Sequence, residues 1–382
     1  MIPITKPSLD EREAEAARRA ILSGWVTQGS EVAAFEREFA AALGAPQACA
    51  VSSCTTALHL ALLGAGVRPG DEVVTVSHSF IATASCIRYC GAIPVFVDID
   101  PGTFNLDPVL VEAAFTPRTA ALLVVHQLGM PCDLRALLEI ARRHSIPVVE
   151  DAACAIGSQI LWDGEWQFIG RPHADVACFS FHPRKLLTTG DGGMLTTRDV
   201  ALDRRFRLWR QHGMDVSDAS RHASRQVVFE SYPELGYNYR MTDIQAAIGR
   251  EQLKRLPGLV AERRELAARY AELLAGIPGL GLPCEPAWAR SNWQSFCVRL
   301  PEHCDQRAVM QRLLEAGVAT RRGVMCAHRE AACPSHTWRA GSPLTQSERA
   351  QDHSILLPLF NGLTLAAQQS IADALRSASS YC

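Results

Sequence analysis

Short apolar runs alternate with longer stretches of helical spacing over the first half of the chain. Between the runs, the residues from Phe80 to Tyr89 and those following Asp133 repeat apolar positions at helical spacing. Such alternation predicts a mainly parallel sheet with helices on both faces. The runs suited to buried strands are 72–77, 94–99, 121–126, 147–151, 175–181 and 194–197, with a shorter extended stretch at Ala50–Val51.

A long helical pattern follows this region. It opens with a Thr242-x-x-Gln245 capping box, is interrupted at Pro257 and continues to Leu274. The segment 276–286 is rich in glycine and proline, and Trp293–Leu300 then predicts a strand. We therefore expect a large domain over residues 1–255, and a linking helix with a smaller C-terminal α/β domain over 256–382.

Composition narrows the classes of partner. The 382 residues carry a formal net charge of −2 and are 48% hydrophobic, without the basic excess that attracts nucleic acid or an anionic membrane. The N-terminus lacks an apolar signal core, and no stretch approaches the roughly 20 apolar residues of a membrane span. These observations predict a cytoplasmic protein that binds neither nucleic acid nor membrane.

The thirteen cysteines lie largely in apolar contexts, which predicts reduced, buried thiols and no disulfide framework. One cluster has zinc-ligand chemistry, comprising Cys326, His328, Cys333 and His336. Its spacing matches no standard zinc finger, so loop packing or substrate contact is favoured and no metal is predicted.

The candidate chemistry centres on Lys185, which follows the apolar run Asp175–Phe181. Most lysines after a strand are solvated, but here Asp151 ends a strand of its own and Gly190–Gly193 lets backbone pass close to a ligand. Burial is expected to make the lysine more nucleophilic. An amine anchor and an acid for a cationic ring are what pyridoxal phosphate requires.

A phosphate cup is predicted where Ser53, Cys54 and Thr55 open an apolar helix, because free N–H groups and the helix dipole favour a dianion there. Simple N-capping by a hydroxyl explains the same pattern locally. Ser180, near the lysine in sequence, adds a second hydroxyl for the same phosphate. Phe80 is suited to stack on a flat ring, although an aromatic there is more often core.

With these residues, the chain resembles the DegT/DnrJ/StrS family of pyridoxal-phosphate sugar aminotransferases. The resemblance implies fold type I of the pyridoxal-phosphate-dependent transferases: a mainly parallel seven-stranded sheet in the large domain and a smaller C-terminal α/β domain. The matching motifs run through most of the chain and comprise 24–29, 53–55, 94–99, 150–153, the lysine motif, 236–243 and 357–360.

Carried over by position, the resemblance implies that Lys185 is the covalent anchor of the cofactor and that Asp151 pairs with its ring nitrogen. Asn238 is similar to a residue that reaches a neighbouring subunit's phosphate, which implies a homodimer with shared sites. The other implied cofactor contacts are Ser53, Cys54, Thr55, Phe80, Cys154 and Ser180; the candidate substrate residues are Thr27, His182, Arg240, Arg321 and Arg322.

Two departures from the family pattern concern these contacts. Cys154 and Ile156 stand where the family often has Gln and His, so the usual contact to the ring hydroxyl is missing or supplied elsewhere. Thr320–Gly323 replaces a frequent His-Tyr-Pro. Its two arginines suit a pyrophosphate or carboxylate, while surface charge is the commoner explanation.

The implied activity is transfer of an amino group, from L-glutamate by resemblance, to a nucleotide-linked keto-sugar. A keto-cyclitol acceptor stays an alternative. A dehydratase using the same cofactor is disfavoured because related dehydratases carry histidine at the lysine position. A non-catalytic regulator is disfavoured because Lys185, Asp151 and the cup are all retained.

Overall fold

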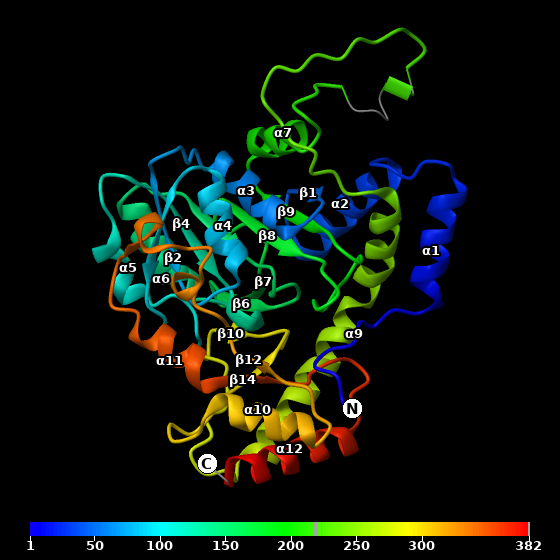
Figure 1. The fold of residues 1–382 in the computed structure, drawn as a ribbon. Helices are drawn as coiled ribbons and strands as arrows, with labels where there is room; N and C mark the ends of the chain where they lie inside the picture. The colour runs from blue at the N-terminus through cyan, green and yellow to red at the C-terminus, as the bar shows by residue number, and fades with distance from the viewer. Residues whose placement is uncertain (217–220, 223, 381–382) are drawn as a thin grey trace.

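The computed structural model describes residues 1–216, 221–222 and 224–380. A large α/β part and a smaller C-terminal part are joined by one long helix (Figure 1). This is the α/β class that the alternating pattern predicts.

The main sheet has the strand order β1-β9-β8-β5-β4-β2-β3-β13. Neighbours from β8 to β13 pair in parallel, whereas β9 runs antiparallel to both β1 and β8. The seven expected strands are present, and the short β13 adds an eighth at the edge. Their bounds are β1 Gln47–Val51, β2 Glu72–Val76, β3 Ile93–Val97, β4 Thr119–Val125, β5 Val148–Asp151, β8 Val176–Ser180, β9 Gly193–Thr197 and β13 Arg339–Ala340.

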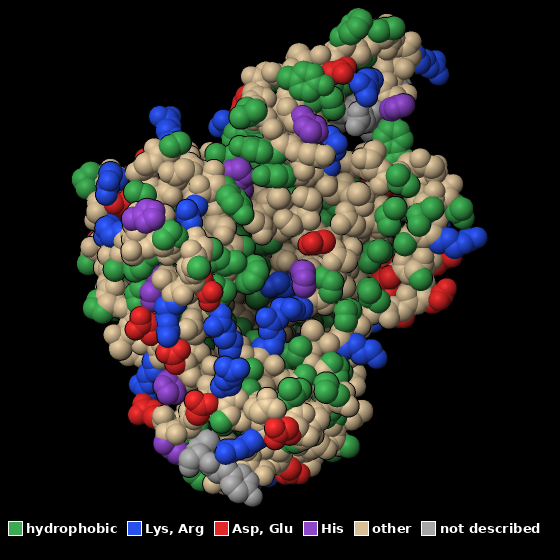
Figure 2. Space-filling view, in the orientation of Figure 1, with side chains coloured by type: hydrophobic (Ala, Val, Ile, Leu, Met, Phe, Trp, Pro, Cys, Tyr) green, Lys and Arg blue, Asp and Glu red, His purple; other side chains and the backbone are tan. Residues whose placement is uncertain are grey.

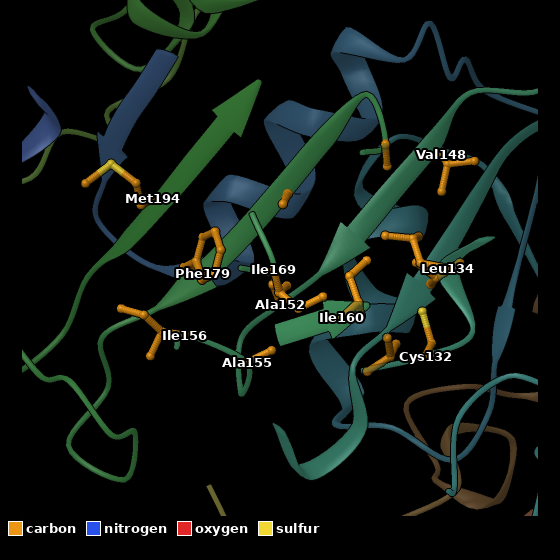
Figure 3. Packing of buried hydrophobic residues seen from close by; sticks show 14 of the residues in the cluster. Cys132, Leu134, Val148, Ala152, Ala155, Ile156, Ile160, Ile169, Phe179 and Met194 are labelled. Atoms are coloured by element: carbon orange, nitrogen blue, oxygen red, sulfur yellow. The ribbon is translucent and has the colours of Figure 1, made fainter. Parts of the chain in front are cut away.

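Helices cover both faces of this sheet because successive strand residues point to opposite sides. Val148 belongs to one buried cluster, part of which Figure 3 shows, and Val149 belongs to the other. Helices α2, α5 and α6 contribute to the first cluster, and α3, α4 and α7 to the second. The bounds are α1 Glu11–Leu22, α2 Ser30–Leu43, α3 Cys54–Gly64, α4 Ile81–Tyr89, α5 Pro108–Ala114, α6 Leu134–Arg143 and α7 Val200–Trp209.

The linking helix α9 spans Asp243–Leu274 without a break, so the predicted interruption at Pro257 is wrong. Its capping box at Thr242 is confirmed. Ala247 packs on α1 in the first half, while Leu266 and Tyr270 enter the core of the small part in the second. Because apolar side chains are buried on both sides of Pro257, the helix continues across the proline.

The small part contains a sheet of order β11-β14-β12, and a hairpin of β6 and β7 pairs with β10 elsewhere. Backbone pairing crosses between the parts at several places, including β13 with β3 and Ile2 near the N-terminus with Val318. The division at residue 255 stays a prediction. The remaining bounds are β6 Gln159–Trp162, β7 Glu165–Phe168, β10 Ala289–Arg290, β11 Phe296–Arg299, β12 Arg321–Arg322, β14 Ser354–Leu357, α10 Gln306–Glu315, α11 Thr345–His353, α12 Leu365–Ser380, and the 3-10 turns η1 Gln127–Gly129, η2 Ala327–Arg329 and η3 Ser335–Thr337.

The segment with zinc-ligand chemistry is engaged in packing. The ring of His328 lies between the Ser77 hydroxyl, 2.6 Å from Nδ1, and Glu348, 3.0 Å from Nε2, while Cys326 Sγ donates to the Ser347 carbonyl. No group of three or more His, Cys, Asp or Glu side chains within the described ranges is arranged to hold a metal ion. Nor does any helix described there have the length and apolar character to cross a membrane.

Candidate active site

The candidate site lies at the carboxyl ends of the parallel strands, where ligands bind in open α/β sheets. Strand β5 ends at Asp151, and the neighbouring β8 ends at Ser180. In the sheet register Asp151 stands opposite Cys178 on one side and Val125 on the other. The acid and the loop that carries Lys185 therefore leave the sheet side by side, as the sequence predicts.

Asp151 is only 6% exposed, and both of its carboxylate oxygens accept hydrogen bonds. Thr83 Oγ1 donates to Oδ2 at 2.8 Å, and the Ala153 N–H donates to Oδ1 at 3.2 Å. Burial raises the pKa of Asp151 above its ordinary value, and these bonds together with Lys185 offset only part of that effect. A buried carboxylate of this kind is stabilised by a cationic partner, which a protonated ring nitrogen supplies.

Lys185 Nζ donates a hydrogen bond to Cys154 Sγ at 3.0 Å. Burial alone lowers the pKa of this lysine, but Cys154, Cys54 and Asp151 outweigh it, so the net pKa lies above the ordinary value. Burial alone would make the free lysine more nucleophilic, as expected from the sequence, but in the cofactor-free protein these neighbours favour the charged form of the amine instead.

The predicted phosphate cup contains both a capping hydroxyl and free donor groups. The Ser53 hydroxyl accepts from the Thr56 N–H and so caps α3. The first-turn N–H groups of Cys54 and Thr55 and the Thr55 hydroxyl have no hydrogen-bond acceptor among the described residues. Gly193 pairs with Val51 and Ser180, and a Cβ at Gly193 would lie 2.4 Å from the Ser53 carbonyl carbon.

These residues fit pyridoxal phosphate. Unpaired donors at the start of a helix suit the phosphate, the buried Asp151 suits the ring nitrogen, and Lys185 suits the aldehyde. The backbone of Gly193 lies close to that of Ser53, so the cup is narrow. A larger residue at position 193 would push β9 away from the start of α3.

A pocket of about 270 Å³ opens above Lys185, between the large part and the small C-terminal part. Figure 2 shows Lys and Arg side chains gathered around the hollow in this region. No acidic partner of Arg184 or Arg321 is found in the described part of the chain, whereas Arg322 pairs with Glu330 at 2.9 Å. The lining includes the predicted residues Phe80, Cys154, Lys185, Arg321 and Arg322, together with Gln127, Leu128, Arg184 and Gln294.

Besides the cup residues and the strand-end residues Asp151 and Ser180, four predicted contacts do not line this pocket. Thr27 is exposed, and its carbonyl accepts from Asp243 at the start of α9. His182 and Asn238 are exposed and Arg240 is half-buried, so their proposed roles stay predictions. Phe80 is exposed at the N-cap of α4, which leaves its ring free to stack.

Sequence reasoning missed the segment that holds the two site loops together. Asn292 Nδ2 donates to the carbonyl of Cys154 at 2.8 Å. Gln294 accepts from the Leu186 N–H at 2.8 Å and donates to the Arg184 carbonyl at 2.5 Å, so it grips both sides of Lys185. Both residues lie more than a hundred positions from their partners, and no local pattern marks them.

The fold and these contacts fit a pyridoxal-phosphate-dependent enzyme of fold type I. Comparison with known proteins agrees: residues 7–376 match the DegT/DnrJ/EryC1/StrS aminotransferase family. The chain belongs to that family and is a pyridoxal-phosphate-dependent sugar aminotransferase.

Relatives extend over most of the molecule. The chain is 41% identical over 301 residues to the spore coat polysaccharide biosynthesis protein SpsC of Bacillus subtilis (strain 168), covering 79% of this chain and 76% of SpsC. The aminotransferase TlmJ from Streptoalloteichus hindustanus is 35% identical with a TM-score of 0.90, covering 100% and 99% of the two chains. The putative sugar aminotransferase Spr1654 from Streptococcus pneumoniae, solved in a PLP form, is 26% identical with a TM-score of 0.90, covering 100% and 99%.

Proposed function

We propose that this enzyme transfers an amino group from L-glutamate to a keto-sugar linked to a nucleotide, for the biosynthesis of an amino sugar. The observation that carries the proposal is the cationic rim of the pocket above Lys185. Arg184 and Arg321 have no acidic partner among the described residues, and both line the pocket. Guanidinium groups bind phosphate oxygens in pairs, so such a rim suits the pyrophosphate of a nucleotide sugar.

Residues of the cup and of the strand ends would hold the cofactor. The N–H groups of Cys54 and Thr55 with the hydroxyls of Thr55 and Ser180 would hold the phosphate, and Phe80 would stack on the ring. Asp151 would hold the proton on the ring nitrogen. When bound, pyridoxal phosphate would supply a carrier for the amino group and an electron sink for charge at the reacting carbon.

Lys185 would then move a proton at its Nζ as general base and acid. Gln294 and Asn292 keep the lysine loop against the Cys154 loop and so fix where that proton is delivered.

We extend the proposal to a homodimer with shared sites. In Figure 1 an arm extends from the large part beyond α7. Its described residues leave large apolar side chains exposed, including Phe229 at 88% and Leu235 at 85%. Exposed apolar side chains of this size favour burial against another protein surface, and a second copy of the chain supplies one.

The test is acceptor specificity. The enzyme is first converted with L-glutamate to its amine form, then offered nucleotide-linked keto-sugars, free keto-sugars and keto-cyclitols. Return of the aldehyde form's absorbance measures transfer. We expect transfer to nucleotide-linked acceptors and a roughly tenfold higher KM for them in Arg321→Ala, because one charged hydrogen bond is lost.

Arg329→Ala is the matched control, because Arg329 pairs with Asp352 and does not line the pocket. It should leave KM unchanged. Equal use of free and nucleotide-linked acceptors, or an Arg321→Ala enzyme with normal KM, would overturn the proposed substrate class.

A further inference from the structure

Cys154 and Lys185 form a close pair that the transfer of an amino group does not explain. The lysine Nζ lies 3.0 Å from the cysteine Sγ, and the two residues belong to loops that follow different strands, β5 and β8. Both line the pocket of about 270 Å³. A thiol and an amine at this distance are close enough to bond once the sulfur is oxidised.

The pairing is fixed by buried groups and does not depend on the lysine rotamer alone. Asn292 donates to the carbonyls of Cys154 and Ile156 at 2.8 and 2.7 Å. Gln294 binds the backbone on both sides of Lys185 and donates its own N–H to Asn292 Oδ1 at 2.8 Å. One buried segment therefore holds the thiol loop and the amine loop in contact.

Access separates Cys154 from the other thiols. Of the free cysteines in the described ranges, Cys284 is exposed, Cys154 is half-buried in the pocket, and the others are buried. Susceptibility to oxidation follows access and a cationic neighbour, and Lys185 supplies that neighbour for Cys154. No hydrogen bond of the Cys284 sulfur to an amine is found among the described residues.

We propose that Cys154 and Lys185 form a covalent sulfur–nitrogen link when the protein meets a hydroperoxide. The Cys154 sulfur attacks one oxygen of hydrogen peroxide, the O–O bond breaks, and a sulfenic acid and water form. The Lys185 ammonium passes a proton to the sulfenate oxygen, its freed nitrogen pair attacks the sulfur, the S–O bond breaks, and a second water leaves as the nitrogen loses one more proton to that oxygen. The sulfur loses two electrons and the peroxide gains two, so thiol, amine and peroxide give the link and two waters.

This link acts as a redox switch on cofactor loading. It occupies the nitrogen that pyridoxal phosphate needs, so the oxidised protein cannot anchor the cofactor, and a thiol reductant reverses it. The inference rests on Lys185 as the cofactor anchor and is independent of the acceptor sugar. Failure of the acceptor test leaves it standing.

The experiment uses the full-length protein, as purified and after removal of the cofactor. Each form is treated with hydrogen peroxide, digested with trypsin and analysed by mass spectrometry. We expect the cofactor-free protein to yield peptide 144–184 joined to peptide 185–198, two hydrogen atoms lighter than their sum. The cofactor-loaded form should yield far less, and dithiothreitol should restore both peptides and the binding of pyridoxal phosphate.

Cys154→Ala and Lys185→Arg should each abolish the joined peptides, while Cys284→Ser should keep them. The Cys154→Ala variant also assigns the sulfur, because peptide 144–184 contains Cys178 as well. Oxygen added to Cys154 without a link to Lys185, or equal linking in the loaded and cofactor-free protein, would overturn the proposal.

Discussion

At the scale of single residues, the buried charge of Asp151 is needed for catalysis but destabilises the cofactor-free protein. Asp151→Asn keeps the side-chain shape and an acceptor for the Ala153 N–H, but removes the charge that holds a proton on the ring nitrogen. We expect transamination to fall by about 10²-fold or more, because preorganised charge is a large part of such catalysis. Steady-state kinetics on the cofactor-saturated variant measure the loss.

The same change should stabilise the cofactor-free protein at neutral pH. The native pKa of Asp151 is raised above its ordinary value of 3.8, so the native state holds the proton more tightly than the unfolded state. The free energy of unfolding therefore falls as pH rises from 3.8 through the native pKa, and Asn removes that fall. The gain in Tm of Asp151→Asn should therefore vanish in acid.

If Asp151→Asn turns over at the normal rate, another acid holds the proton on the ring nitrogen.

The sequence pattern predicts Lys185, Asp151 and the cup as candidate site residues, because each follows an apolar run of its own. It could not mark Thr83, Asn292 or Gln294. Their site contacts are made to residues 68 to 138 positions away, and such pairs leave no periodic signal. The raised pKa of Lys185 could not be predicted for the same reason, since it depends on Cys154, Cys54 and Asp151.

At the scale of elements, two neighbouring hydroxyls at the start of α3 have different roles, one in capping the helix and one in binding the cofactor. The Ser53 hydroxyl accepts from Thr56, whereas the Thr55 hydroxyl has no hydrogen-bond partner in the described chain. Ser53→Ala should cost about 1 kcal/mol of folding free energy through the lost cap. Thr55→Val should leave stability near wild type and weaken cofactor binding by roughly tenfold, because a hydrogen bond to a charged phosphate is lost.

Thermal unfolding of the cofactor-free variants and titration with pyridoxal phosphate separate the two effects. Stability is compared without the cofactor, since a bound ligand itself raises Tm. The assignment of capping to Ser53 and of phosphate binding to Thr55 is wrong if Thr55→Val destabilises the protein as much as Ser53→Ala does. It is also wrong if the Thr55→Val variant binds the cofactor normally.

Helix α9 shows where local pattern misleads. Proline removes one hydrogen bond in a helix interior and normally ends or kinks it, so Pro257 predicted a break. Pro257 and Gly258 are exposed, while Leu256 and Leu259 beside them are buried. Burial of the apolar face along Asp243–Leu274 outweighs the local cost, and this burial is fixed by α1, α2 and the small part together.

At the scale of the whole molecule, the order of strands and helices predicted the sheet but not the contacts that tie the parts together. Strand β13 comes from the C-terminal third and pairs with β3, and Ile2 pairs with Val318. The two-residue β13 is too short for a periodic signal. The pocket above Lys185 depends on such ties, because its lining comes from Ile4, from the large part and from β12.

Sharing of sites between subunits is the last prediction. The loop with Asn238 is held firmly: Tyr237 and Tyr239 donate to the carbonyls of Trp209 and Arg210, and Ser52 donates to the Tyr239 carbonyl. The exposed Asn238 side chain is thus presented on a fixed loop, and family resemblance implies that it reaches the neighbour's phosphate. Lys185→Ala and Asn238→Ala subunits should each be impaired as homodimers, but their heterodimer should contain one doubly defective site and one intact site.

Activity should therefore reappear when the two variants are mixed and allowed to exchange, in proportion to the heterodimer isolated through two different affinity tags. A mixture of Lys185→Ala with Asp151→Asn is the matched control. Asp151 ends β5 and Lys185 lies on the loop after β8 of the same chain, so that heterodimer has a defect in each site and gains nothing. The Ser52–Tyr239 hydrogen bond also keeps the Asn238 loop beside its own cup. If the verified heterodimer is no more active than its parents, Asn238 serves its own subunit and the shared-site proposal is wrong.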